Sequence, residues 1–193
     1  MTATPLRNLI ALSGLKQFPS PQTFYVRRSF LPMGRDCYWQ INSGVVRTYS
    51  WLDDGSIVVY GLWGEGDIIS PLLAKSDLQM ECMTDVKVSS LSLDRLIEVN
   101  QALINQTKEL QELINIKQYR PVNTALIKLL KWLSNKFGHR THNGILIDLR
   151  LTHQQIAETL GTTRVTVTRL LTIFEHQGKI DRTSNGKIII KNN

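Results

Sequence analysis

The chain has 193 residues, of which 42% are hydrophobic and 20% charged, a balance typical of a globular protein. The sequence holds no apolar run of the roughly 18 residues that would span a bilayer. Its first residues lack the apolar stretch and cleavage site of a secretory signal, so we expect a cytoplasmic protein with no membrane partner. Two cysteines, Cys37 and Cys82, are too few for a four-thiolate iron–sulfur site or a disulfide framework. Buried free thiols are the favoured interpretation, and a redox-sensing pair is the alternative.

The positive charge is concentrated in the second half of the chain. The net charge is +7. Residues 1–99 carry 9 Lys/Arg against 10 Asp/Glu, whereas residues 100–193 carry 14 against 6. This asymmetry favours a polyanionic partner for the second half alone.

Residues 23–93 alternate between short runs rich in Val, Ile, Tyr and Trp and clusters of turn residues. The runs cover residues 37–41, 45–51, 57–63 and 86–93. Strands separated by turns at this spacing predict an antiparallel barrel or roll. One tryptophan recurs in each of three successive runs, namely Trp39, Trp51 and Trp63. We expect all three to pack inside the roll, with ligand stacking as the alternative.

The period of the apolar residues changes from about residue 96. The apolar residues then occupy the two seam positions of a heptad, namely Leu96, Val99, Leu103, Leu110 and Leu113. A helix with such a narrow apolar stripe is suited to pairing with its twin, so we expect a dimerisation helix. The alternative is that the stripe packs on the roll of its own chain.

Pro121 interrupts this helix, because proline lacks an N–H and crowds the preceding turn. Proline is accepted as the first residue of a new helix, and residues 121–137 show a second apolar face. The junction at Arg120 and Pro121 is therefore interpreted as a hinge. The expected domains are a sensor-like β-roll over residues 1–99, a dimerisation helix over 100–120 and a DNA-binding domain over 121–193.

Residues 152–171 have the pattern of a helix-turn-helix. Thr152 and Gln155 form a capping box that starts a helix, and Gly161 ends it with a tight turn. Thr163 can cap a second helix, whose apolar residues recur at helical spacing and must face the core. These inward residues are Val167, Leu170, Leu171 and Phe174.

The opposite face of this second helix is basic and rich in hydroxyl groups. It carries Arg164, Val165, Thr168, Arg169 and Thr172. Side chains in the first turns of such a helix can reach base edges in a major groove. Arginine can bind guanine O6 and N7, and valine offers an apolar surface to a thymine methyl group. The alternative is an amphipathic helix pair with a solvated basic face.

Hydroxyl groups and a polar hairpin flank this face. Thr163 and Thr166 suit phosphate contacts that fix register. Residues 182–187 form a polar turn before an apolar strand, and residues 145–149 form another strand before the motif. A small hairpin beside two such helices predicts a winged helix-turn-helix, in which Lys187 or Arg182 contacts the DNA backbone.

On these residues the chain resembles the Crp/Fnr family of bacterial regulators. The resemblance covers essentially the whole chain, and residues 137–171 are similar to the cyanobacterial nitrogen-control branch. It implies an α+β fold with an N-terminal antiparallel β-roll of the cyclic-nucleotide-binding type, a long dimerisation helix and a C-terminal winged helix-turn-helix. It also implies a transcription regulator that binds palindromic double-stranded DNA as a homodimer, with RNA polymerase as a further candidate partner.

Family members typically read the groove with Arg, Glu and Arg at the positions of Arg164, Val165 and Arg169. A glutamate accepts a hydrogen bond from cytosine N4, and valine cannot. The resemblance therefore implies half-sites similar to GTA rather than GTGA.

The sensor half lacks residues that cyclic-nucleotide-binding members use. Those members hold the ribose phosphate with a Gly-Glu pair and an Arg-Ser/Thr pair. Here no Gly-Glu follows Asp67, and no arginine lies between Arg47 and Arg95. A buried phosphate would be poorly compensated, so we expect no control by cAMP. The nitrogen-control branch responds to 2-oxoglutarate through arginines, and Arg120 is the only arginine in residues 96–120. The effector is not identified, and a regulator without an effector is an open alternative.

The four histidines, His139, His142, His153 and His176, lie outside the predicted roll. This placement argues against a metal-dependent, cupin-like enzyme, which needs histidines and carboxylates inside its barrel. We predict no catalytic residue, no metal site and no cofactor. The alternative function is a small-molecule-binding or catalytic β-roll protein with a basic nucleic-acid-binding tail.

Overall fold

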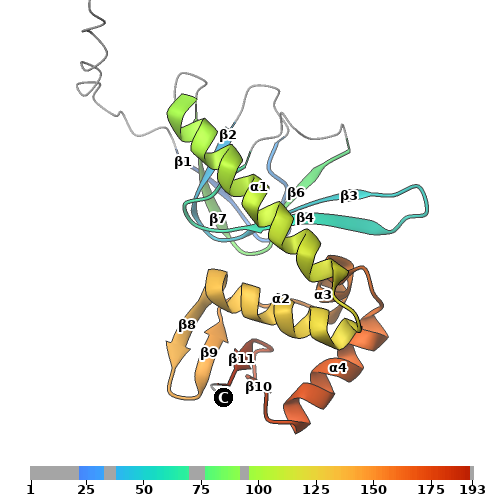
Figure 1. The fold of residues 1–193 in the computed structure, drawn as a ribbon. Helices are drawn as coiled ribbons and strands as arrows, with labels where there is room; N and C mark the ends of the chain where they lie inside the picture. Colours follow the sequence, from blue (N-terminus) through green and yellow to red (C-terminus); the bar gives the residue numbers. More distant parts are fainter. Residues whose placement is uncertain (1–21, 33–37, 70–76, 92–95, 192–193) are drawn as a thin grey trace, which may run out of the picture.

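The computed structural model describes residues 22–32, 38–69, 77–91 and 96–191, with side chains described from residue 100 onward in the first helix. The strands and helices are β1 (Gln22–Tyr25), β2 (Tyr38–Ser43), β3 (Val46–Trp51), β4 (Ile57–Trp63), β5 (Ile68–Ile69), β6 (Gln79–Cys82), β7 (Val86–Leu91), α1 (Leu96–Gln118), α2 (Val122–Phe137), β8 (Gly138–Thr141), β9 (Gly144–Ile147), α3 (His153–Leu160), α4 (Arg164–His176), β10 (Ile180–Arg182) and β11 (Ile188–Ile190). Figure 1 shows a strand-rich part, the long helix α1 and a C-terminal part of helices and short strands.

The first seven strands form a roll of two antiparallel sheets. One sheet has the order β1-β7-β2-β5, and the other has the order β4-β3-β6. Apolar side chains from both sheets share one core, formed by Leu31, Trp39, Ile41, Val46, Trp63, Ile69, Met80, Cys82, Val86 and Val88. Alternating inward residues from facing sheets produce such a core. The expected roll is therefore present.

The three tryptophans do not all pack inside the roll. Trp39 and Trp63 are buried, but Trp51 is 53% exposed. Trp51 is the last residue of β3, where the hairpin to β4 leaves the core. It packs edge-on against Tyr49 instead, with ring centroids 6.1 Å apart. The expectation is correct for two positions and wrong for Trp51.

One of the two cysteines is described by the structure. Cys82 is a buried free thiol, and burial raises its pKa. A raised pKa disfavours the reactive thiolate. Cys37 lies outside the described residues.

Helix α1 follows the roll and ends beside the C-terminal part (Figure 1). Its last residue is Gln118, and α2 begins at Val122 with Pro121 at the N-cap. The helical stretch is thus interrupted where the proline predicts. The boundary expected at residue 99 falls inside α1, so the division into domains stays a prediction.

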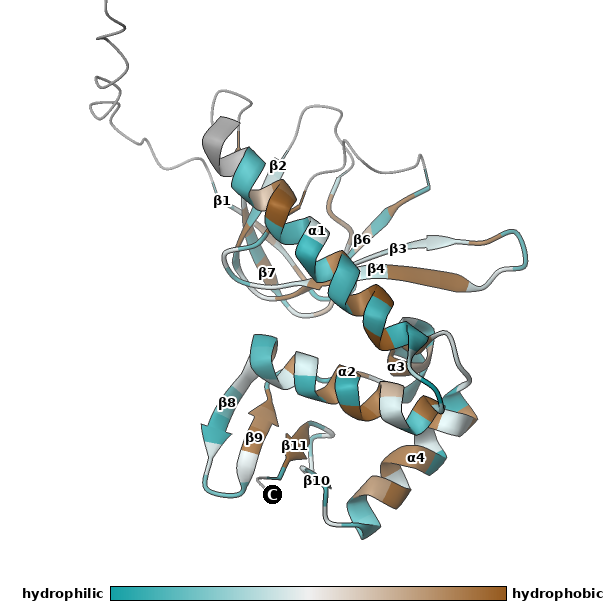
Figure 2. Ribbon diagram, viewed as in Figure 1, coloured by the Kyte–Doolittle hydropathy of each residue, from teal (hydrophilic) through white to brown (hydrophobic). Residues whose placement is uncertain are grey.

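The C-terminal part packs three helices on a small sheet of order β10-β11-β9-β8. Figure 2 shows β9 and β11 as hydrophobic. Their side chains join a core with α2, α3 and α4 that includes Leu126, Leu130, Ile147, Ile156, Leu171, Phe174 and Ile190. Together with the roll and α1, this architecture confirms the expected α+β fold. In the described part of the chain, no helix is both long and apolar enough to cross a membrane.

Two cations connect the roll to the C-terminal part. Arg47 of β3 is 5% exposed and binds Glu81 of β6 at 2.7 Å and Glu158 of α3 at 2.6 Å. Lys136 of α2 lies 3.0 Å from the carboxylate of Asp67, in the turn before β5. Its Nζ is also 5.2 Å from the centre of the Trp63 ring, a cation–π distance.

Candidate nucleic-acid interface

Local hydrogen bonds define the start of α3. The Thr152 side chain accepts from the Gln155 N–H at 3.1 Å, and the Gln155 side chain accepts from the Thr152 N–H at 2.9 Å. This reciprocal pair satisfies two backbone donors that the first turn leaves free. The predicted capping box is therefore present.

The turn between α3 and α4 uses one left-handed residue. Gly161 has φ 66° and its N–H bonds back to α3. A side chain at this φ would be strained, which explains glycine. Thr163 then caps α4, because its hydroxyl accepts from the Thr166 N–H at 3.2 Å. The two hydroxyl groups of this pair are also 2.9 Å apart.

Helix α4 divides into a buried and an exposed face. Val167, Leu170, Leu171 and Phe174 are buried, as their spacing predicts. On the opposite face Arg164, Thr168 and Arg169 are exposed, and Val165 is 77% exposed. A large apolar side chain this exposed, between two arginines, gives the helix a surface that is both basic and partly apolar. We call Arg164, Val165, Thr168 and Arg169 the reading face.

The Thr168 hydroxyl has partners within the protein. It donates to the Arg164 carbonyl at 2.9 Å and lies 2.7 Å from Nδ1 of His153 in α3. His153 was not among the expected site residues, because the sequence does not show that it contacts α4. The one sequence feature that could have placed His153 near the site was its position directly after the capping Thr152.

The hairpin of β10 and β11 is the wing. Arg182 forms an ion pair with Glu175 of α4, and its Nε lies 3.0 Å from the carboxylate. This hydrogen bond lowers the pKa of Glu175. Lys187 is ion-paired with Asp148, the residue directly after β9. Arg182 and Lys187, the two candidate contacts to the DNA backbone, are thus each ion-paired with a neighbouring part of the protein. Lys187 is also half-buried.

The expected dimerisation residues differ in position. Leu113 is 1% exposed and packs in the core of its own chain. Leu103 is half-buried and Leu110 is exposed, while the side chains of Leu96 and Val99 lie outside the described residues. Next to Leu113, Ile114 is 48% exposed. The outward apolar side chains of α1 therefore include Ile114 in place of Leu113.

Comparison with known proteins defines the family. Residues 125–193 match the model of the Crp-like helix-turn-helix domain. The chain is 38% identical over 176 residues to the regulatory protein CysR of Synechococcus elongatus, covering 89% of this chain and 85% of CysR. The chain belongs to the Crp/Fnr family of transcription regulators.

Other relatives of this regulator match over varying shares of its length. The global nitrogen regulator of Synechococcus elongatus is 42% identical over 71 residues, which are 37% of this chain and 32% of that protein. The relatives are regulators and not enzymes, which argues against a catalytic roll with a basic tail.

Solved structures share the fold of this regulator. A CRP-family regulator from Thermus thermophilus has a TM-score of 0.76 at 19% identity, covering 88% of this chain and 92% of that chain. A CooA mutant from Carboxydothermus hydrogenoformans has a TM-score of 0.72 at 21% identity, covering 90% and 84%. At these identities the likeness shows the fold alone.

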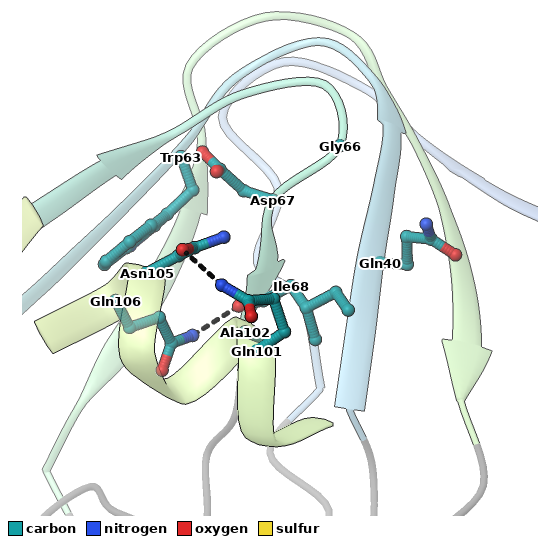
Figure 3. A pocket seen from close by; sticks show the side chains of 9 residues that line it. All are labelled: Gln40, Trp63, Gly66, Asp67, Ile68, Gln101, Ala102, Asn105 and Gln106. Atoms are coloured by element: carbon teal, nitrogen blue, oxygen red, sulfur yellow. Dashed lines mark hydrogen bonds between the residues drawn. The ribbon is translucent and has the colours of Figure 1, made fainter. Parts of the chain in front are cut away.

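The regulator has a polar pocket of about 340 Å³ between the roll and α1. Figure 3 shows carboxamide side chains from β2 and α1 around it, with the Gln101 amide donating to Asn105 and the Gln106 amide to the Ile68 carbonyl. The lining residues are Gln40, Trp63, Gly66, Asp67, Ile68, Gln101, Ala102, Asn105 and Gln106. Among these described residues none carries a positive charge.

Proposed function

We propose that this regulator binds a palindromic duplex as a homodimer and places α4 of each protomer in the major groove of one half-site. The observation that carries the proposal is the reading face, where the exposed Val165 lies between Arg164 and Arg169. A recognition helix contacts base edges through the residues near its N-terminus, and these residues occupy the first two turns of α4.

Each residue of the interface has a distinct proposed role. Arg164 and Arg169 donate to guanine O6 and N7, and Val165 packs against a thymine methyl group. Thr163 and Thr166 at the start of α4 contact phosphates, as does Lys187 of the wing. Because valine offers no acceptor for cytosine N4, the proposed half-site is GTA-like.

Helix α1 provides the proposed dimer contact. Leu103, Thr107, Leu110 and Ile114 recur at alternating intervals of four and three residues. This is the repeat of a two-stranded coiled coil. Thr107, Leu110 and Ile114 are exposed, whereas the half-buried Leu103 also packs against Tyr38 and Leu91 of its own roll. Pairing of α1 with its twin would cover the exposed Leu110 and Ile114 and present two copies of α4 to two-fold-symmetric DNA.

We further propose that cAMP does not control this regulator. The sole arginine of β3, Arg47, is bound by two carboxylates and is not among the residues that line the pocket. The described lining offers carboxamides and the Asp67 carboxylate but no cation, so a phosphate bound there would be poorly compensated. The pocket and its effector are otherwise unassigned. Because its proposed partner is DNA, we propose a cytoplasmic location for the regulator. RNA polymerase is a candidate partner at the promoter.

Random-site selection with the full-length protein tests this function. The proposal expects an enriched inverted repeat of GTA-like half-sites, separated by about one helical turn between centres. Binding should also weaken steeply as the salt concentration rises, because phosphate contacts release counterions. Enrichment of no sequence, or of half-sites without guanine opposite the arginines, would contradict the proposal.

A further inference from the structure

A hydrogen bond connects the first residue of α3 to the reading face of α4. His153 Nδ1 lies 2.7 Å from the Thr168 Oγ1, and the Thr168 hydroxyl donates to the Arg164 carbonyl at 2.9 Å. A hydroxyl group has one proton to donate. Thr168 must therefore accept from His153, and this places the proton of the neutral ring on Nδ1.

The second ring nitrogen, Nε2, points away from Thr168. In the neutral ring Nε2 is an acceptor, and in the charged ring both nitrogens are donors. The bond from Nδ1 to Thr168 is the same in both forms. Protonation of His153 therefore leaves the position of Thr168 unchanged and alters only what Nε2 offers to a ligand.

Two arginines face His153 from the elements packed against α3. Burial first, and then the charges of Arg182 in β10 and Arg164 in α4, lower the pKa of His153. Arg182 is itself paired with Glu175. In the free protein the ring is accordingly neutral at neutral pH.

We propose that His153 belongs to the DNA-binding surface, where it positions the Thr168 hydroxyl through Nδ1 and, on taking up a proton, donates from Nε2 to a DNA phosphate. This inference rests on the proposed function. In helix-turn-helix complexes the second helix lies in the major groove and the first helix crosses the phosphate backbone. A side chain at the start of α3 that contacts the reading face of α4 lies between these two surfaces.

DNA binding then raises the pKa of His153, because a nearby phosphate favours the charged ring. Contacts between Arg164 and DNA also reduce the repulsion that opposes protonation. Since the complex holds a proton that the free protein releases, affinity increases as pH falls between the two pKa values. A rise of one unit in the pKa of His153 on DNA binding corresponds to an increase in affinity of about ten-fold for each His153.

Fluorescence anisotropy of the full-length protein on its selected palindrome tests this coupling between about pH 6 and about pH 8. The wild type should bind several-fold more tightly at the lower pH. His153→Asn keeps a donor for Thr168 near the position of Nδ1 but does not titrate, so its affinity should change little between the two pH values. His153→Arg is charged over the whole pH range and should bind DNA tightly at both pH values.

His176→Gln is the matched control, because His176 is exposed at the far end of α4. It should keep the wild-type pH profile. NMR titration of the His153 ring should also show a higher pKa in the DNA complex than in the free protein. A wild-type profile retained in His153→Asn, or an unchanged His153 pKa on binding, overturns the inference. Failure of the wild type to bind at any pH would contradict the proposed function instead.

Discussion

Residues at short spacing determine both ends of α3 and the start of α4. The capping box of Thr152 and Gln155, the left-handed Gly161 and the cap at Thr163 each act within one turn of chain. Such features can be predicted from sequence because the partners are neighbours. The contact of His153 with Thr168 joins two helices across the turn, and its geometry depends on their packing, so the sequence did not predict it.

The identity of residue 165 should set one base preference. Val165→Glu supplies the acceptor for cytosine N4 that valine lacks. We predict a shift in selected half-sites from GTA-like toward GTGA-like, with about ten-fold discrimination at that base pair. Val165→Ala removes the apolar surface without adding an acceptor. It should therefore weaken the preference for thymine without creating a preference for another base. Random-site selection with both variants measures this, and an unchanged site in Val165→Glu would count against the assigned role.

At the scale of elements, the long strands and helices were predictable, as were the short strands β9 and β11, but β5 and β8 were not. Strands β2, β3, β4 and β7 coincide closely with apolar runs in the sequence. Strand β5 has two residues, and β8 begins at Gly138, directly after the last residue of α2. Short strands carry little periodicity of their own and form because a partner strand is present.

The orientation of α1 also depends on long-range packing. The expected stripe ran through Leu113, which the structure buries against its own chain. A narrow apolar stripe does not reveal whether a given side chain faces its own core or a twin helix. Only the position of the roll and α2 beside α1 turns Leu113 inward and leaves Ile114 outward.

Ile114→Glu tests the dimer contact. In a paired helix the two glutamates would lie opposite each other without partners, so the dimer should dissociate at concentrations where the wild type is dimeric. Sedimentation velocity measures this. Asn115→Glu is the matched control, because Asn115 is exposed on α1 outside the proposed seam and gains the same charge. A dimer that survives Ile114→Glu would contradict the seam.

At the scale of the whole molecule, ion pairs join the roll to the C-terminal helices beside the apolar packing of Val45, Leu62 and Met83. Arg47 and Glu158 are 111 residues apart in sequence and 2.6 Å apart in the structure. Lys136 makes a second connection, through Asp67 and Trp63, which also line the pocket. Pairings at such separations cannot be predicted from one sequence, because charge alone does not identify the partner.

A double-mutant cycle with Arg47→Met and Glu158→Gln measures the first of these connections. Both side chains are largely buried, and removing one partner of a buried pair leaves the other uncompensated. We predict that each single change lowers the free energy of unfolding, with a coupling energy of about 1 kcal/mol or more in denaturant titrations. A coupling near zero would show that the pair does not hold α3 against the roll.

The central claim is that the reading face of α4 recognises DNA sequence. The most direct test compares the affinities for the selected palindrome and for a scrambled duplex at one salt concentration. Arg169→Ala should reduce this ratio by about ten-fold or more, because a bidentate contact to guanine is lost. Lys87→Ala removes an exposed cation from β7 of the roll and should leave the ratio unchanged. Full sequence preference in Arg169→Ala would contradict the account.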